Sequence, residues 1–154
     1  MELKPGDKAR PFKLATDGGG TISLSSLKGR PFVFYFYPKD DTSGCTKEAL
    51  DFTKYSRKFE ALGVAVIGVS KDSVASHEKF ITKHKLKLIL ASDPETKVAE
   101  TYGMWVEKSM YGRKYMGMER ATFLVDATGK IREIWRKVKV PGHAEAVLAA
   151  AKSL

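Results

Sequence analysis

The segment FVFYFYPKDDTSGCTKEAL, which runs from Phe32 to Leu50, carries the strongest structural signal in the chain. It opens with an unbroken run of aromatic and aliphatic side chains, which is typical of a strand buried on both faces. The run ends at Pro38, a polar turn follows, and a helical pattern begins near Cys45. A buried strand that leads directly into a helix is a building unit of α/β proteins.

Similar patterns alternate along the rest of the chain. Further strands are expected at Val64–Val69, Lys87–Ala91, Ala121–Val125 and Ile131–Trp135, with a turn at Asp126–Gly129 between the last two. The glycine cluster at Gly18–Gly20 separates two apolar pieces, so it predicts the loop of an N-terminal β-hairpin.

Helical periodicity fills the intervals between these strands. One helix is expected to hold Cys45 in its first turn, to align Phe52, Tyr55, Phe59 and Leu62, and to stop at Gly63. Others are expected from Ser73 to Lys85 with Asp72 as cap, from Pro94 at a first helical position, and from Gly142 onward. This order predicts an α/β, thioredoxin-like fold in one domain over residues 1–154, with a mixed central sheet flanked by helices.

Composition limits the class of protein. The chain has 154 residues, of which 43% are hydrophobic and 29% charged, as in an ordinary soluble globular domain. No stretch approaches the ~20 apolar residues of a membrane span, and the N-terminus lacks the apolar core of a secretory signal. A single cysteine excludes an internal disulfide and fits a reducing compartment, so we expect a cytoplasmic protein without membrane attachment.

The net charge of +9 is compatible with acidic partners, nucleic acid included. The basic residues are nevertheless spread along the chain, and one cysteine cannot complete a Cys/His zinc site. A solvated basic surface is therefore favoured over specific nucleic-acid binding.

Two interpretations of Cys45 are open from its surroundings. Cysteine is among the most buried residue types, so Cys45 can be a small core residue on an apolar helical stripe. Alternatively, its place in the first turn of a helix favours an anion, and a thiolate is such an anion. Thr42 has a hydroxyl that can reach back toward the sulfur, but a cation from elsewhere in the fold is also needed.

The pattern Pro38-x-x-x-Thr42-x-x-Cys45 resembles the active-site signature of the peroxiredoxins. The longer string YFYPKDDTSGCTKEA resembles the PrxQ branch, also called bacterioferritin comigratory protein. Two later segments resemble the same branch: YGMWVEKSMYGRKYMGMERATFLVD, from Tyr102 to Asp126, and WRKVKVPGHAEAVL, from Trp135 to Leu148.

The resemblance implies a role for each matching residue. Cys45 is the peroxide-reactive cysteine, Pro38 shields it and Thr42 forms a hydrogen bond with it. The active-site arginine of the family matches Arg120, in MERATF, and Arg113 is a weaker candidate. The thiolate then attacks a peroxide oxygen and becomes a sulfenic acid, with no metal or other cofactor.

Glu48 lies one turn after Cys45, and we expect it to orient Arg120 through a hydrogen bond. Two positions depart from the family pattern. Many PrxQ proteins have a second cysteine where this chain has Leu50, which also lies off the apolar stripe of its helix. Ser43 stands where the family often has proline.

Without a second cysteine, the sulfenic acid must be resolved by an external thiol. The candidates are thioredoxin, glutaredoxin and glutathione, and the substrates are hydrogen peroxide and organic hydroperoxides. We expect a monomer or a weak dimer. An alternative function is a peroxide-sensing redox adaptor, which oxidises once and passes the oxidation to a partner protein; a basic nucleic-acid-binding protein is less favoured.

The histidines and methionines are interpreted as structural. His77 and His84 are separated by roughly 10.5 Å along a helix, too far to chelate one ion, so we expect partly buried or surface imidazoles. His143 is expected to be structural. Four methionines are clustered in the segment before Arg120, and we expect them to fill gaps in packing rather than line a substrate entrance. They are Met104, Met110, Met116 and Met118.

Overall fold

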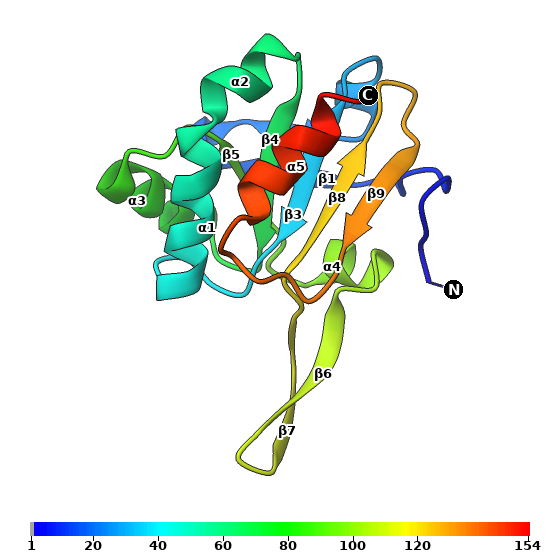
Figure 1. The fold of residues 1–154 in the computed structure, drawn as a ribbon. Coiled ribbons are helices and arrows are strands. Elements are labelled where there is room, and N and C mark those ends of the chain that lie inside the picture. The colour runs from blue at the N-terminus through cyan, green and yellow to red at the C-terminus, as the bar shows by residue number, and fades with distance from the viewer. Residues whose placement is uncertain (1) are drawn as a thin grey trace.

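The computed structural model describes residues 2–154 (Figure 1). Its centre is a seven-stranded sheet with the order β2-β1-β5-β4-β3-β8-β9. The strands are β1 (Lys13–Thr16), β2 (Thr21–Ser23), β3 (Phe32–Phe36), β4 (Ala65–Ser70), β5 (Ile89–Ser92), β8 (Ala121–Val125) and β9 (Ile131–Trp135). Pairs β3–β4 and β4–β5 are parallel and the others antiparallel, so the sheet is mixed, as predicted.

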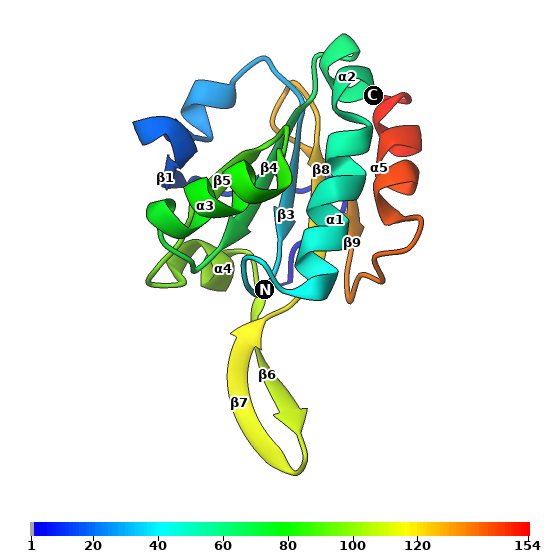
Figure 2. The ribbon, with the colours of Figure 1, turned by 90° about the vertical axis from the view of Figure 1, so that its left-hand side faces the viewer.

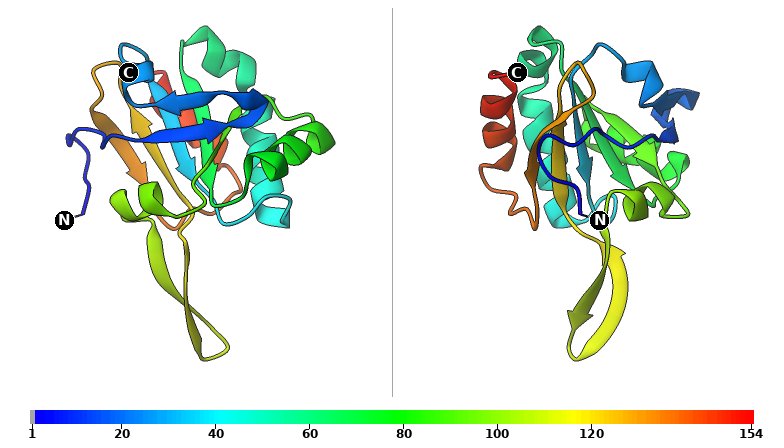
Figure 3. Two further views of the ribbon diagram at one scale, coloured as in Figure 1. Left: turned by 180° about the vertical axis from the view of Figure 1, so that it is seen from behind. Right: turned by 90° about the vertical axis from the view of Figure 1, so that its right-hand side faces the viewer.

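Helices cover both faces of this sheet (Figures 1 and 3). They are α1 (Ser43–Lys54), α2 (Ser56–Ala61), α3 (Val74–His84), α4 (Lys97–Thr101) and α5 (His143–Ala151). Alternate residues of β3 enter two separate apolar cores, because successive side chains of a strand point to opposite faces. Phe34 packs with the N-terminal segment and α4, whereas Tyr35 packs with α1, α2, α3 and α5.

The predicted strands and the N-terminal hairpin are confirmed, with η1 (Asp17–Gly19) as the hairpin loop. The helix that holds Cys45 was expected to continue to Leu62, but it breaks at Tyr55 into α1 and α2. Tyr55 has φ −100° and ψ 10°, outside the helical range. The apolar stripe continues across this break, which is why the sequence pattern reads as a single helix.

One expected helix cap and one expected helix start are wrong. Ser73, and not Asp72, caps α3, since its side chain accepts a hydrogen bond from the Ser76 amide. Pro94 precedes α4 instead of opening it. The carboxylate of Asp93 accepts hydrogen bonds from the amides of the first turn of α4, at 2.9 Å for Ala99.

The sequence did not predict the hairpin formed by β6 (Trp105–Met110) and β7 (Arg113–Met118). A two-residue turn joins the strands, with positive φ at Tyr111 (51°) and Gly112 (78°), as a tight hairpin requires. The hairpin projects away from the body of the molecule (Figure 2).

The four methionines divide between the body and this hairpin. Met104 and Met118 are buried and fill the core, as expected, whereas Met110 and Met116 are more than half exposed. The packing interpretation therefore fails for two of the four. Within residues 2–154, no helix has the length and apolar character needed to cross a membrane.

Candidate active site

The register of two central strands brings Cys45 and Arg120 together where β3 ends and β8 begins. Here and below, an edge of the sheet means one of the two sides formed by the strand ends. Phe36, the last residue of β3, pairs with Ala121, the first residue of β8. The chain leaves β3 at this edge toward α1, and Arg120 directly precedes β8. Residues distant in sequence therefore meet beside the first turn of α1.

The Arg120 guanidinium bridges Cys45 and Glu48. Its Nη2 donates to the Cys45 sulfur at 3.3 Å, and its Nη1 donates to Glu48 Oε1 at 2.7 Å. The planar guanidinium presents several donors in fixed directions, and Arg120 is held in place by β8, which follows it directly. Both features suit such a double contact. Gly44 leaves space for it, because a Cβ atom there would lie 3.1 Å from Arg120 Nη2.

Cys45 and Glu48 are almost closed to solvent, whereas the Arg120 side chain is 17% exposed. Cys45 is 2% exposed and Glu48 is 1% exposed. Burial raises the pKa of Glu48 to about 7, although the neighbouring Arg120 charge acts in the opposite direction. Burial works against the Arg120 cation, but Glu48 and Cys45 outweigh it and raise the pKa of Arg120. The second Glu48 oxygen, Oε2, has no hydrogen-bond partner among residues 2–154.

Cys45 occupies the first turn of α1, which begins at Ser43. Backbone N–H groups in a first helical turn lack intrahelical acceptors and favour an anion. Thr42 is the N-cap residue, but its single hydroxyl proton points to the Lys39 carbonyl oxygen at 2.8 Å and not to the sulfur. Pro38 is half-buried in the loop that leads to Thr42.

A buried network that sequence reasoning missed holds this loop. Asp40 accepts hydrogen bonds from Tyr37 Oη at 2.5 Å and Ser76 Oγ at 2.8 Å, and its Oδ2 lies 2.7 Å from His77 Nδ1. His77 Nε2 lies 3.0 Å from the Ala91 carbonyl oxygen. His77 thus links the loop, through Asp40, to the backbone of β5.

A second contact to α3 follows immediately in the loop. Asp41 contacts Lys83 Nζ at 2.7 Å and His84 Nε2 at 2.8 Å on the surface. His77 is fully buried, so the expectation of a partly buried or surface imidazole is wrong for it and right for His84. No signal in the local sequence links Asp40 to His77, because the pair joins segments far apart in the chain.

The other candidates lie outside the contact group. His143 is buried, forms a 2.7 Å hydrogen bond with Thr122 and has a pKa lowered to about 4, first by burial and then by the Arg120 charge. Arg113 is exposed at the tip of the β6–β7 hairpin. Leu50 is 39% exposed, which agrees with its place off the apolar stripe.

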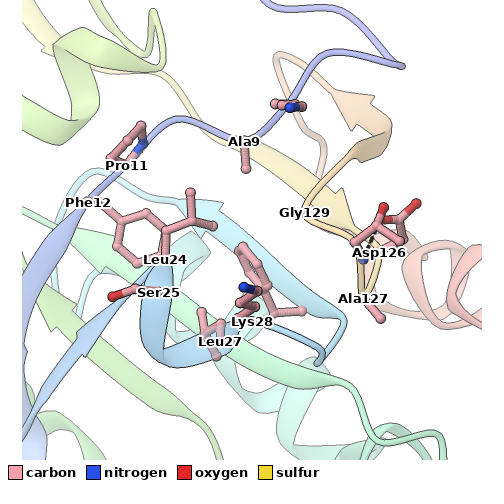
Figure 4. Close-up of a pocket in the computed structure, with 13 residues that line it drawn as sticks. Ala9, Pro11, Phe12, Leu24, Ser25, Leu27, Lys28, Asp126, Ala127 and Gly129 are labelled. Atoms are coloured by element: carbon pink, nitrogen blue, oxygen red, sulfur yellow. Dashed lines mark hydrogen bonds between the residues drawn. The ribbon is translucent and has the colours of Figure 1, made fainter.

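An apolar cavity of about 400 Å³ lies at the opposite edge of the sheet (Figure 4). Its wall includes Phe12, Leu24, Leu27 and Phe32, the first residue of β3. It is thus separated from Cys45 by the length of β3. Among residues 2–154, no cluster of three or more His, Cys, Asp or Glu side chains is arranged to hold a metal ion.

Comparison with known proteins agrees with this geometry. Residues 5–134 match the AhpC/TSA family, and the chain belongs to that family. The chain is 48% identical to the putative peroxiredoxin Bcp of Coxiella burnetii, over 96% of this chain and 98% of that protein. It is 45% identical to the peroxiredoxin Bcp of Bacillus subtilis, over 100% of this chain and 98% of that one.

The fold also matches a solved structure. The bacterioferritin comigratory protein of Xanthomonas campestris, studied for its alkyl peroxide reduction activity, superposes with a TM-score of 0.88 at 43% identity. The match covers 92% of this chain and 90% of that one. The resemblance to the PrxQ branch is therefore confirmed, and the predicted thioredoxin-like fold with it.

Proposed function

We propose that the chain is a thiol-dependent peroxidase in which Cys45 reacts with hydrogen peroxide and organic hydroperoxides. The observation that carries the proposal is the contact between the buried Cys45 sulfur and Arg120, at 3.3 Å. A buried thiolate requires a nearby positive charge, and only the thiolate attacks peroxide. Alkyl peroxide reduction by the Xanthomonas campestris relative supports the same substrate class.

The oxidative step involves few groups. The Cys45 thiolate attacks one peroxide oxygen, a sulfur–oxygen bond forms, and the oxygen–oxygen bond breaks. The leaving hydroxide or alkoxide takes up a proton, and Cys45 becomes a sulfenic acid. Arg120 and the N–H groups at the start of α1 stabilise the charge that moves from sulfur to oxygen, and Pro38 shields the sulfur.

Two further residues position this group. Glu48 holds the Arg120 fork through the 2.7 Å contact, so that Nη2 stays directed at the sulfur. Thr42 contributes to the turn through its bond to Lys39. A hydroxyl can both donate and accept, so Thr42 is also the residue proposed to donate to the thiolate or the bound peroxide.

The reductive step needs a thiol from outside the chain, because the sequence contains one cysteine. The external thiolate attacks the Cys45 sulfur, water leaves, and a mixed disulfide forms. A second thiol then releases Cys45. Thioredoxin, glutaredoxin and glutathione fit this role, and a reducing compartment such as the cytoplasm supplies them. We place the protein there as a monomer or a weak dimer.

Turnover tests the proposal against a sensor that oxidises once. Peroxide consumption is followed with the purified protein, a thiol supply and excess hydrogen peroxide. We expect many equivalents of peroxide to be consumed per chain, and none above background with Cys45→Ser. Consumption that stops at one equivalent, with every thiol supplied, would overturn the peroxidase cycle.

A further inference from the structure

The β6–β7 hairpin projects from the sheet edge at which α1 begins (Figures 1 and 2). Its exposed large side chains are Met110, Tyr111, Tyr115 and Met116. An isolated two-stranded hairpin is marginally stable in water, so large apolar side chains exposed on one make it a candidate interaction site.

The strand register defines two unlike faces. Directly opposite residues of an antiparallel pair point to the same side. The pairs Val106–Gly117, Lys108–Tyr115 and Met110–Arg113 therefore form one side, here called the cysteine-side face. The alternate pairs Trp105–Met118, Glu107–Met116 and Ser109–Lys114 form the far face.

The two apolar cores show which face is turned toward Cys45. Met118 of the far face is buried in the core that contains Phe34, and Trp105 packs against the same core, whereas Cys45 belongs to the core on the opposite side of the sheet. The alternate pairs, which include Lys108, therefore point toward the Cys45 side.

Burial lowers the pKa of Lys108, the Arg120 charge lowers it further, and Glu119 and Cys45 act in the opposite direction. The influence of Arg120 and Cys45 on the pKa of Lys108 agrees with this orientation. The alkyl chain of Lys108 and the Tyr115 ring lie over Gly117, where a Cβ atom would contact Lys108 Cδ at 3.1 Å and Tyr115 Cε2 at 3.4 Å.

Charge separates the two faces. The cysteine-side face has two cations, Lys108 and Arg113, and no acidic residue. On the far face, Glu107 lies 3.7 Å from Lys114 and offsets its charge. The cysteine-side face is therefore cationic, with an apolar component from Met110 and Tyr115.

A second copy of the chain is a poor occupant of this surface. Each copy has a net charge of +9, so two cationic faces repel one another. An acidic partner is attracted instead, and such attraction mainly raises the rate of association. The partner that must reach this edge is the one that delivers a thiol to Cys45.

We propose that the cysteine-side face is the docking surface for an acidic dithiol protein that reduces oxidised Cys45, an inference that rests on the proposed peroxidase function. The first partner thiolate attacks the Cys45 sulfur; a sulfur–sulfur bond forms, the sulfur–oxygen bond breaks, and hydroxide leaves as water after protonation. The second partner thiol then forms the disulfide within the partner and restores the Cys45 thiol.

The test compares two neighbouring charge reversals, Arg113→Glu on the cysteine-side face and Lys114→Glu on the far face. Cys45 is first oxidised with one equivalent of hydrogen peroxide, and its reduction by a recombinant thioredoxin of net negative charge is followed by stopped flow. At low salt we expect the second-order rate constant to fall about tenfold in Arg113→Glu and less than about twofold in Lys114→Glu. High salt should reduce the difference.

Dithiothreitol, a small neutral thiol, serves as the control reductant and should restore Cys45 equally fast in all three proteins. Equal rate constants for Arg113→Glu and Lys114→Glu with thioredoxin would overturn the docking proposal. So would a loss of self-association in Arg113→Glu, by light scattering, without an effect on thioredoxin.

Failure of the proposed function gives a different result, since either peroxide does not oxidise Cys45 or none of the supplied thiols, dithiothreitol included, restores it. In that case, equilibrium binding of the thioredoxin to the Cys45→Ser protein decides the docking proposal. Weaker binding by Arg113→Glu than by Lys114→Glu supports the surface, and equal binding rejects it. Circular dichroism confirms that each variant is folded.

Discussion

At the scale of single residues, one guanidinium contacts both a buried sulfur and a buried carboxylate. Nη2 of Arg120 donates a hydrogen bond to the Cys45 sulfur, and Nη1 donates one to Glu48. The two contacts use the fixed geometry of the fork, which lysine does not have. Arg120 is therefore expected to act through position as well as charge.

Replacing Arg120 with methionine removes the positive charge and both contacts at similar side-chain length. We expect the second-order rate constant with hydrogen peroxide to fall by about 10²–10³, the usual effect of deleting one preorganised donor. Arg132→Met is the matched control, because Arg132 lies on β9 in a surface contact with Asp126. Equal rates for Arg120→Met and the wild-type protein would exclude Arg120 from the reaction.

The raised pKa of Glu48 predicts a pH dependence of stability. Its pKa is about 7 in the folded chain and about 4.5 as its ordinary value. Between these values the folded state keeps a proton that the unfolded state loses, so stability falls as pH rises. The contribution is fully present below about pH 4.5 and is lost as pH passes through about 7.

Glu48→Gln stays uncharged and should lack this loss. Urea unfolding at pH 5 and pH 8 measures it, and we expect the wild-type protein to lose on the order of 1–3 kcal/mol more than the variant between these values. His143, with its lowered pKa, changes stability in the opposite direction. It is present in both proteins, so it cancels in the comparison. Parallel pH profiles would contradict a raised Glu48 pKa.

Local sequence predicted some of these residues and missed others. Cys45 and Thr42 belong to one short motif, and Arg120 was placed through the resemblance of a later segment. Asp40 and His77 were missed, because a buried pair between a loop and a distant helix leaves no periodic signal. The Thr42 hydroxyl direction was also out of reach, since it depends on the position of the Lys39 carbonyl.

At the scale of elements, α3 holds the loop between β3 and α1. Two consecutive residues of this loop contact it in different environments. Asp40 is buried against His77, whereas Asp41 meets Lys83 and His84 at the surface. Any displacement of the loop would shift the first turn of α1 and Cys45 with it.

The two aspartates form a matched pair of variants. Asp40→Asn removes the carboxylate that the buried network of Tyr37, Ser76 and His77 contacts, and we expect a loss of about 1–3 kcal/mol in the free energy of unfolding, as for buried polar groups left without partners. Asp41→Asn, at an exposed site, should cost much less. Denaturant unfolding measures both, and an equal loss in the two variants would show that burial of the Asp40 pair is unimportant.

Elements with a distinct pattern of apolar residues were predicted from the sequence, and elements without one were missed. The continuous apolar runs of β3 and β8 identified buried strands, with bounds close to those observed. The β6–β7 hairpin was missed, because most of its side chains are exposed on both faces and no apolar alternation marks it. The break at Tyr55 was missed because α1 and α2 share one apolar stripe.

At the scale of the whole molecule, a central sheet with a core on each face supports one reactive edge. The end of β3, the start of β8 and the first turn of α1 meet there, and the β6–β7 hairpin extends beyond it (Figure 3). The alternation of strands and helices predicted the fold class from the sequence. The arrangement of this edge depends on strand order and register, which the sequence pattern alone does not specify.

The reaction of the reduced protein with one equivalent of hydrogen peroxide tests the central claim most directly. Stopped flow follows the loss of the Cys45 thiol, and intact mass identifies the product. We expect a reaction far faster than that of a free thiol, with the gain of one oxygen or a dimer linked through Cys45, and no reaction in Cys45→Ser. A rate no greater than that of a free thiol would mean that Arg120 and α1 do not activate Cys45, and would contradict the account.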